Sequence, residues 1–143
     1  MSLKRSKLPQ VKRKDRKTRI WSSNVADSKF SHFIRDRDNG ICFFCKRPGS
    51  QNSHFWGRGK SALRYEPDNC DYVCGGCHMR HEGSKQGLYA ELKLKQLGQK
   101  RYDELRKLAF QSRMNRREAI IACMNLLKSY EQVGYGNNLA GKL

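Results

Sequence analysis

Four of the six cysteines form two closely spaced pairs, Cys42-x2-Cys45 and Cys74-x2-Cys77, with 28 residues between the pairs. Two such pairs supply four thiolates at the short spacing that a tetrahedral Zn²⁺ site needs. A disulfide interpretation is less favoured, because CxxC bridges are usually redox-active and no thioredoxin-like unit surrounds these cysteines. We therefore expect structural Zn²⁺ whose binding free energy stabilises the fold, so that removing the metal unfolds residues 42–82.

Two histidines and an asparagine, His54, Asn69 and His78, follow one another in the pattern H-x14-N-x8-H, in and beside the same loop. These residue types suit phosphodiester hydrolysis, which needs a base to deprotonate water and a cation to stabilise the leaving alkoxide. His54 can be neutral at working pH and take the proton, and His78 can ligate a catalytic cation, for which we expect Mg²⁺ or Mn²⁺. Asn69 can hydrogen-bond across the loop and hold His54 in one orientation.

The composition favours a polyanionic partner. Thirty basic residues against 13 acidic ones give a formal net charge of +17, so nucleic acid is the first candidate and an anionic membrane surface the second. No apolar run approaches the ~20 residues that span a bilayer, and the N-terminus lacks the apolar core of a signal peptide. We expect a soluble, cytoplasmic protein that binds DNA and does not use a membrane.

Two groups of cations are the candidates for binding DNA. Residues 1–19 carry nine basic side chains and one acid, and this segment is either a basic arm that orders on phosphates or a solvated tail. Between His54 and Asn69, glycines beside cations allow the backbone to approach phosphates closely. The candidates are Lys12, Arg13, Lys14, Arg16, Lys17 and Arg19 in the arm, and Arg58, Lys60 and Arg64 in the loop.

Local patterns predict a small α+β fold. We expect a helix from Ser28 to Gly40 with Asp27 or Ser28 as N-cap, strands at 52–55 and 71–73, and helices after Cys77 that Gly98 interrupts. This gives a flexible basic arm over residues 1–27, a zinc-bound core over 28–84 and a helical extension over 85–143. The extension ends in a long apolar stripe from Ala119 to Tyr130, which either buries itself against a second copy in a homodimer or folds back onto the helices of residues 88–109.

An asparagine five residues before a CxxC-His resembles the pattern of the HNH nucleases. The resemblance implies a ββα-metal element in a treble-clef zinc scaffold, with His54 as general base, Asn69 tying the loop and His78 holding the catalytic metal. His81 and Glu82 are further candidate ligands if a helix follows the second CxxC. Many members have a metal ligand just before the base, where this chain has Ser53. Either His78, His81 or Glu82 and water hold the metal, or His54 is itself a ligand and not the base.

A longer set of motifs resembles the NinG/Rap family of lambdoid-phage recombination proteins over residues 28–110. The motifs are FIRDRD from Phe33, SHFxGRGK from Ser53 and LRYxxDN from Leu63, together with both CxxC pairs and LYxxL from Leu88. This resemblance implies a phage-encoded endonuclease, acting in a bacterial cytoplasm on branched recombination intermediates such as D-loops and Holliday junctions.

Two other functions remain open from the sequence. A non-catalytic zinc-finger protein that binds DNA or RNA needs only the positive charge and the four cysteines, but it leaves the H-x14-N-x8-H pattern unexplained. A phage HNH nuclease without junction preference would hydrolyse DNA by the same chemistry but would not select branched substrates. Two symmetric cuts in a four-way junction need two active sites, which favours the homodimer.

Overall fold

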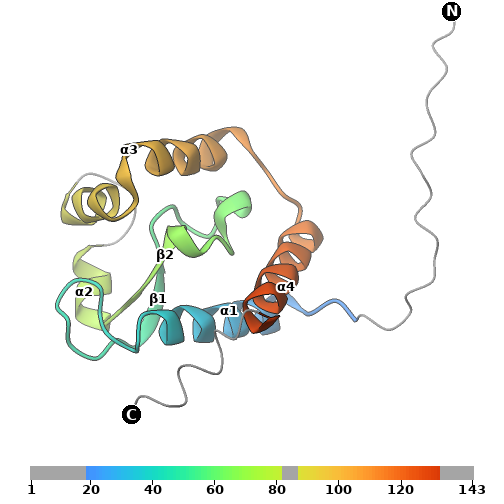
Figure 1. The fold of residues 1–143 in the computed structure, drawn as a ribbon, viewed down its shortest axis with the longest axis horizontal. Helices are drawn as coiled ribbons and strands as arrows, with labels where there is room; N and C mark the ends of the chain where they lie inside the picture. The colour runs from blue at the N-terminus through green and yellow to red at the C-terminus, as the bar shows by residue number, and fades with distance from the viewer. Residues whose placement is uncertain (1–18, 82–86, 133–143) are drawn as a thin grey trace, which may run out of the picture.

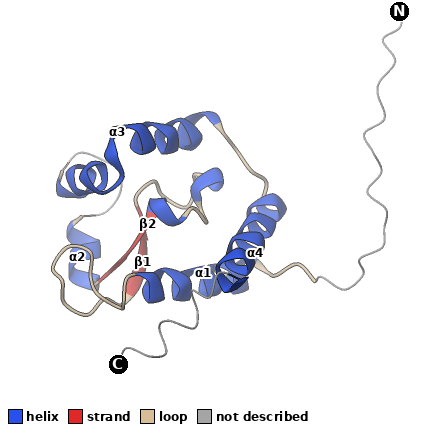
Figure 2. Ribbon diagram, viewed as in Figure 1, coloured by secondary structure: helices blue, strands red, loops and turns tan. Residues whose placement is uncertain are grey.

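The computed structural model describes residues 19–81 and 87–132 and has a mixed helical and β architecture, which confirms the α+β expectation (Figures 1 and 2). Its regular elements, in chain order, are α1 (Ser23–Arg37), β1 (Gln51–His54), the 3-10 turns η1 (Ser61–Leu63) and η2 (Pro67–Asn69), β2 (Cys70–Val73), α2 (Gly75–Arg80), α3 (Leu88–Gln111) and α4 (Arg116–Gln132). The two strands pair antiparallel, with Gln51 opposite Val73 and His54 opposite Cys70. Both strands lie within one residue of the predicted positions, 52–55 and 71–73.

Helices cover both faces of this small sheet. Because successive side chains of a strand point to opposite faces, Cys70 and Tyr72 join the core formed with α1 and α4, whereas Asp71 between them points to α3. In Figure 1, α3 passes along one side of the strands, and α1 and α4 lie on the other. A second core joins the residues after β1 to α3 and contains Phe55, Trp56, Leu63, Tyr89, Leu105 and Ala109.

Helix α1 begins earlier than the sequence pattern predicts. Ser22 is the N-cap, its hydroxyl accepting a hydrogen bond from the Val25 N–H at 3.3 Å, so the expected start at Ser28 is wrong. Asp27 lies inside the helix and is not its cap. The helix ends as expected near Gly40, where the Gly40 N–H donates to the Arg35 carbonyl at 2.8 Å.

The C-terminal end of α1 is fastened to β2 by Arg37 and Asp38. The Arg37 guanidinium donates to the backbone carbonyls of Pro67 at 2.7 Å and Cys70 at 2.6 Å. Asp38 in turn accepts from the Tyr72 N–H at 2.8 Å. These bonds explain what the last residues of the FIRDRD motif do in this fold, which is to lock the helix against the strand that precedes the second cysteine pair.

Helix α3 is held to the sheet by a fully buried ion pair. Lys93 Nζ lies 2.8 Å from Asp71 Oδ2, both side chains are inaccessible to solvent, and the Tyr89 hydroxyl donates to the same carboxylate oxygen at 2.7 Å. Gly98 interrupts the helix with a φ of 77°, as expected from the sequence. Among the described residues, no helix has the length and apolar character needed to cross a membrane.

Helix α4 packs against α1 of the same chain. Asn115 and Glu118 cap its start reciprocally, at 2.9 and 2.8 Å. The stripe that begins with Ala119, Ile120 and Cys123 is buried in the core shared with α1, so it neither folds onto residues 88–109 nor remains exposed. The homodimer therefore stays a prediction that this stripe no longer supports.

Candidate functional site

The four paired cysteines come together at one end of the sheet. Cys42 and Cys45 lie in a turn closed by the bridge between Ile41 and Pro48, where the Cys42 N–H donates to the Arg47 carbonyl at 2.7 Å. Cys74 is the N-cap of α2 and Cys77 lies in its first turn. Since β2 ends at Val73, the strand delivers the second pair directly to the first.

The geometry of this cluster fits a tetrahedral metal ion. All four sulfurs lie within 4.8 Å of one another, and the Cys45 and Cys74 sulfurs are 3.8 Å apart. Zinc–sulfur bonds of ~2.3 Å in a tetrahedron place the sulfurs ~3.8 Å apart. Hydrogen bonds from the backbone and side chain of Arg47 lower the pKa of Cys45 to about 6, whereas burial and the neighbouring cysteines raise the pKa of Cys77 to about 12. These cysteines could therefore hold the expected structural Zn²⁺.

The two remaining cysteines, Cys70 and Cys123, are buried in the core between the sheet, α1 and α4. Burial raises the pKa of both thiols, that of Cys123 to about 12. Both therefore serve as small apolar core residues.

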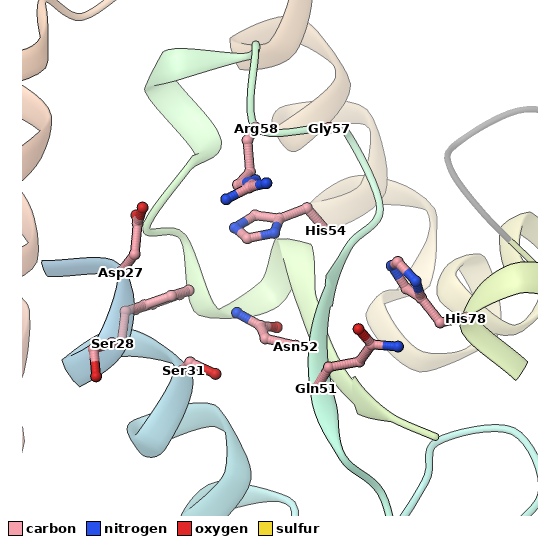
Figure 3. Close-up of a pocket in the computed structure, with 10 residues that line it drawn as sticks. Asp27, Ser28, Ser31, Gln51, Asn52, His54, Gly57, Arg58 and His78 are labelled. Atoms are coloured by element: carbon pink, nitrogen blue, oxygen red, sulfur yellow. The ribbon is translucent and has the colours of Figure 1, made fainter. Parts of the chain in front are cut away.

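A cleft of about 590 Å³ lies between α1, β1 and α2 (Figure 3). Its lining residues are Asp27, Ser28, Phe30, Ser31, Gln51, Asn52, His54, Gly57, Arg58 and His78. Both predicted catalytic histidines thus line one cleft, although they come from different elements and are 24 positions apart in the sequence. Figure 3 shows the Arg58 guanidinium beside the His54 ring, and the Gln51 side chain extending from β1 on the side where His78 lies.

The ring of His54 is held by one nitrogen. Nε2 lies 2.9 Å from the backbone carbonyl oxygen of Arg64, and because a carbonyl only accepts, this nitrogen carries the proton of the neutral ring. The lone pair of a neutral His54 is therefore on Nδ1. Burial lowers the pKa of His54, the charges of Arg58 and Arg64 lower it further, and the bond to the Arg64 carbonyl opposes them. A neutral His54 is what a general base requires.

Asn69 ties the loop after β1 through three buried hydrogen bonds. Its Oδ1 accepts from the Trp56 N–H at 2.8 Å, and its Nδ2 donates to the carbonyls of Trp56 at 2.9 Å and Leu63 at 3.1 Å. Asn69 does not bond to the His54 ring. It fixes the backbone next to Arg64, the residue whose carbonyl holds that ring, so its effect on His54 is transmitted through the loop.

The proposed ligands of a catalytic metal are not all brought together. His78 lines the cleft, but α2 ends at Arg80, and the His81 ring packs against Phe44 with centroids 4.6 Å apart. Glu82 lies outside the described residues. Ser53 is buried and pairs with Asp71 across the sheet, on the face opposite to His54. Within the described ranges, the cysteine cluster is the one group of three or more ligand side chains close enough to share an ion.

The loop cations have different surroundings. Arg58 is exposed at the cleft, whereas Arg64 donates to both Asp27 carboxylate oxygens at 2.7 and 3.1 Å and is not free for phosphate. Lys60 lies over the Phe110 ring, 4.3 Å from its centroid. Of the arm, Arg19 is exposed, and Lys12, Arg13, Lys14, Arg16 and Lys17 lie outside the described residues.

Sequence reasoning did not predict Asp27, Gln51 or Asn52 as residues of the site, although all three line the cleft. Asn52 could have been identified, because strand alternation places it on the same face as His54. Its Oδ1 is buried without a hydrogen-bond partner in the part of the chain that the structure describes.

Comparisons with models of known protein families, with curated proteins and with solved structures find no match for this chain.

Proposed function

We propose that this protein is a metal-dependent DNA endonuclease of the HNH type. In this proposal β1, β2 and α2 form the ββα-metal element, and the four cysteines form the structural zinc site of a treble clef. The observation that carries the proposal is the placement and protonation of His54. This residue lines the same cleft as His78 and Arg58. Its Nε2 is hydrogen-bonded to the Arg64 carbonyl, and its pKa is lowered.

The roles of the residues follow from this geometry. His54 accepts the proton of the attacking water at Nδ1, while the Arg64 carbonyl stabilises the proton on Nε2 and fixes the ring. Arg58 lies beside the ring and binds the scissile phosphate. Asn69 keeps the loop between Trp56 and Leu63 in the conformation that presents these groups.

His78 would hold a divalent cation, Mg²⁺ or Mn²⁺, and the amide oxygen of Asn52 is a second candidate ligand because it is buried and has no partner among the described residues. When bound, such a cation would supply the positive charge that stabilises the leaving oxygen. Neutral imidazole and amide oxygen are donors that these cations accept, with water completing the shell.

The substrate we propose is DNA, with branched recombination intermediates preferred. The net charge of +17 supports a polyanionic substrate, and the NinG/Rap resemblance supports the branched class and a phage origin. Paired cleavage of a four-way junction would be served by a homodimer with two active sites.

A second candidate function is a zinc protein that binds nucleic acid without cutting it. The observation that favours it is the sparse ligand set of the cleft. His81 packs on Phe44. Asp27, the one carboxylate among the described residues that line the cleft, is already bonded to Arg64 and to the Tyr65 hydroxyl. In this function, Arg58 would bind phosphate and His54 would be structural.

One assay separates the two functions. Zinc-loaded protein is incubated with a four-way junction and with a linear duplex of matched sequence, each with Mg²⁺, with Mn²⁺ and without added cation. A metal-dependent nuclease cuts DNA only when the cation is added, and one that prefers branched substrates cuts the junction faster than the duplex. Binding of both substrates without any cation-dependent cleavage would support the non-catalytic function.

A further inference from the structure

A large aromatic side chain is exposed near the C-terminal end of α3. The Phe110 side chain is 64% exposed, whereas Phe30 and Phe55 are at most 1% exposed. Two surface hollows of about 430 Å³ each meet at this ring. One is lined by residues of α3, and the other by the loop after β1 and the segment that connects α3 to α4. Phe110 therefore lines both hollows.

Four cations surround this ring. Lys60 lies over its face, Arg106 and Lys107 line one hollow, and Arg113 lines the other. In the described part of the chain, none of the four has an acidic partner. We refer to Phe110 and these four cations as the Phe110 platform. An apolar protein partner would leave the cations unpaired, whereas a chain of aromatic bases joined by phosphates matches both the ring and the charges.

The Phe110 platform lies next to the cleft. Lys60 follows Arg58, a lining residue of the cleft, by two positions, so their Cα atoms are at most ~7.6 Å apart. The same short loop thus contributes one cation to each place. A DNA strand whose phosphate contacts Arg58 can reach Lys60 with a neighbouring phosphate.

From this arrangement we propose that the Phe110 platform binds unpaired nucleotides, with a base stacked on Phe110 and the flanking phosphates on the four cations. This inference rests on the proposed DNA function and adds a specific feature of the substrate, a single-stranded segment beside the site of cleavage. Base pairs inside a duplex are stacked on both faces and expose neither to an aromatic ring, so the platform would prefer unpaired strands, as at a branch or flap.

The test measures the affinity of full-length, zinc-loaded protein by fluorescence anisotropy, without added divalent cation. The probes are a blunt duplex and the same duplex with a short single-stranded thymidine extension. Phe110→Ala should weaken binding of the extended duplex by roughly 5- to 150-fold, as expected for loss of one stacked base, and change binding of the blunt duplex less than about twofold. Phe110→Trp should retain the preference. Leu108→Ala, which removes another partly exposed side chain of α3, is the matched control and should change neither affinity.

Equal affinity of Phe110→Ala and the unchanged protein for the extended duplex would overturn the proposal and leave the ring to a protein partner. Equal weakening on both probes would also overturn it, since that result places the effect on duplex binding or folding. Cleavage is scored separately with Mg²⁺ and Mn²⁺ on a four-way junction and on linear duplex. If the unchanged protein cuts neither substrate but shows the Phe110-dependent preference for the extended duplex, the nuclease function fails and the platform proposal stands. If the protein cuts DNA but shows no such preference, the platform proposal fails and the nuclease function stands.

Discussion

Asn69→Ala should destabilise the protein strongly, because Asn69 is fully buried and is the partner of three backbone groups. The substitution leaves the Trp56 N–H and the carbonyls of Trp56 and Leu63 without their partner in the core. At ~1–2 kcal/mol for each buried group left unsatisfied, the free energy of unfolding should fall by ~3–6 kcal/mol. That loss is a large part of the ~5–15 kcal/mol available to a small domain.

Urea unfolding of the zinc-loaded protein, followed by circular dichroism, measures this loss. Asn24→Ala is the matched control, because Asn24 is an exposed residue of α1, and its free energy of unfolding should change by less than ~0.5 kcal/mol. Asn69→Asp keeps the acceptor for the Trp56 N–H but turns a charge toward two carbonyls, so it should be no more stable than Asn69→Ala. A free energy of unfolding for Asn69→Ala within 0.5 kcal/mol of the unchanged protein would refute the argument that Asn69 holds this loop.

Three further predictions concern the metal, the buried ion pair and the pH dependence. Cys45→Ser should reduce the zinc content measured by elemental analysis and should unfold the region around the cysteine cluster, seen as faster amide exchange; full zinc content would contradict this. Lys93→Met should lower the free energy of unfolding by up to ~3 kcal/mol in urea titrations, because it removes the nearest counter-charge of the buried Asp71 carboxylate and leaves Arg37, 3.9 Å away, as its cationic partner; an unchanged midpoint would contradict it. The lowered pKa of His54 means that the base stays neutral to lower pH, so the acid limb of cleavage should lie below the ordinary histidine pKa of ~6.5. Arg58→Ala removes a charge that lowers this pKa, so it should move the acid limb to higher pH, and a limb that moves to lower pH would contradict the assignment.

The cysteine cluster and both strands could be predicted from local sequence. The two CxxC pairs predict that their four sulfurs share one metal site. The turn-forming residues on either side of 52–55 and 71–73 mark where the strands begin and end. His54 and Asn69 are each attached to an end of those strands, so their proximity follows once the strands pair. Short-range patterns were sufficient for all of these.

The errors come from long-range contacts. Asp27 has the residue type of an N-cap, yet its carboxylate binds Arg64, which is 37 positions away. The periodicity of α4 identifies which face is buried but not which surface covers it, and here α1 covers it. His81 is predicted to share a helical face with His78 only if α2 continues, but α2 ends at Arg80.

The central claim is that His54 is the general base of a nuclease. The most direct measurement compares single-turnover cleavage of a four-way junction by the unchanged protein, His54→Ala and His32→Ala, with zinc content and DNA affinity measured on the same preparations. His32 is an exposed histidine of α1 and serves as the control. We predict that His54→Ala retains zinc and DNA binding and loses cleavage by ~10²-fold or more, and that His32→Ala cleaves normally. Cleavage by His54→Ala at the rate of the unchanged protein would contradict the claim.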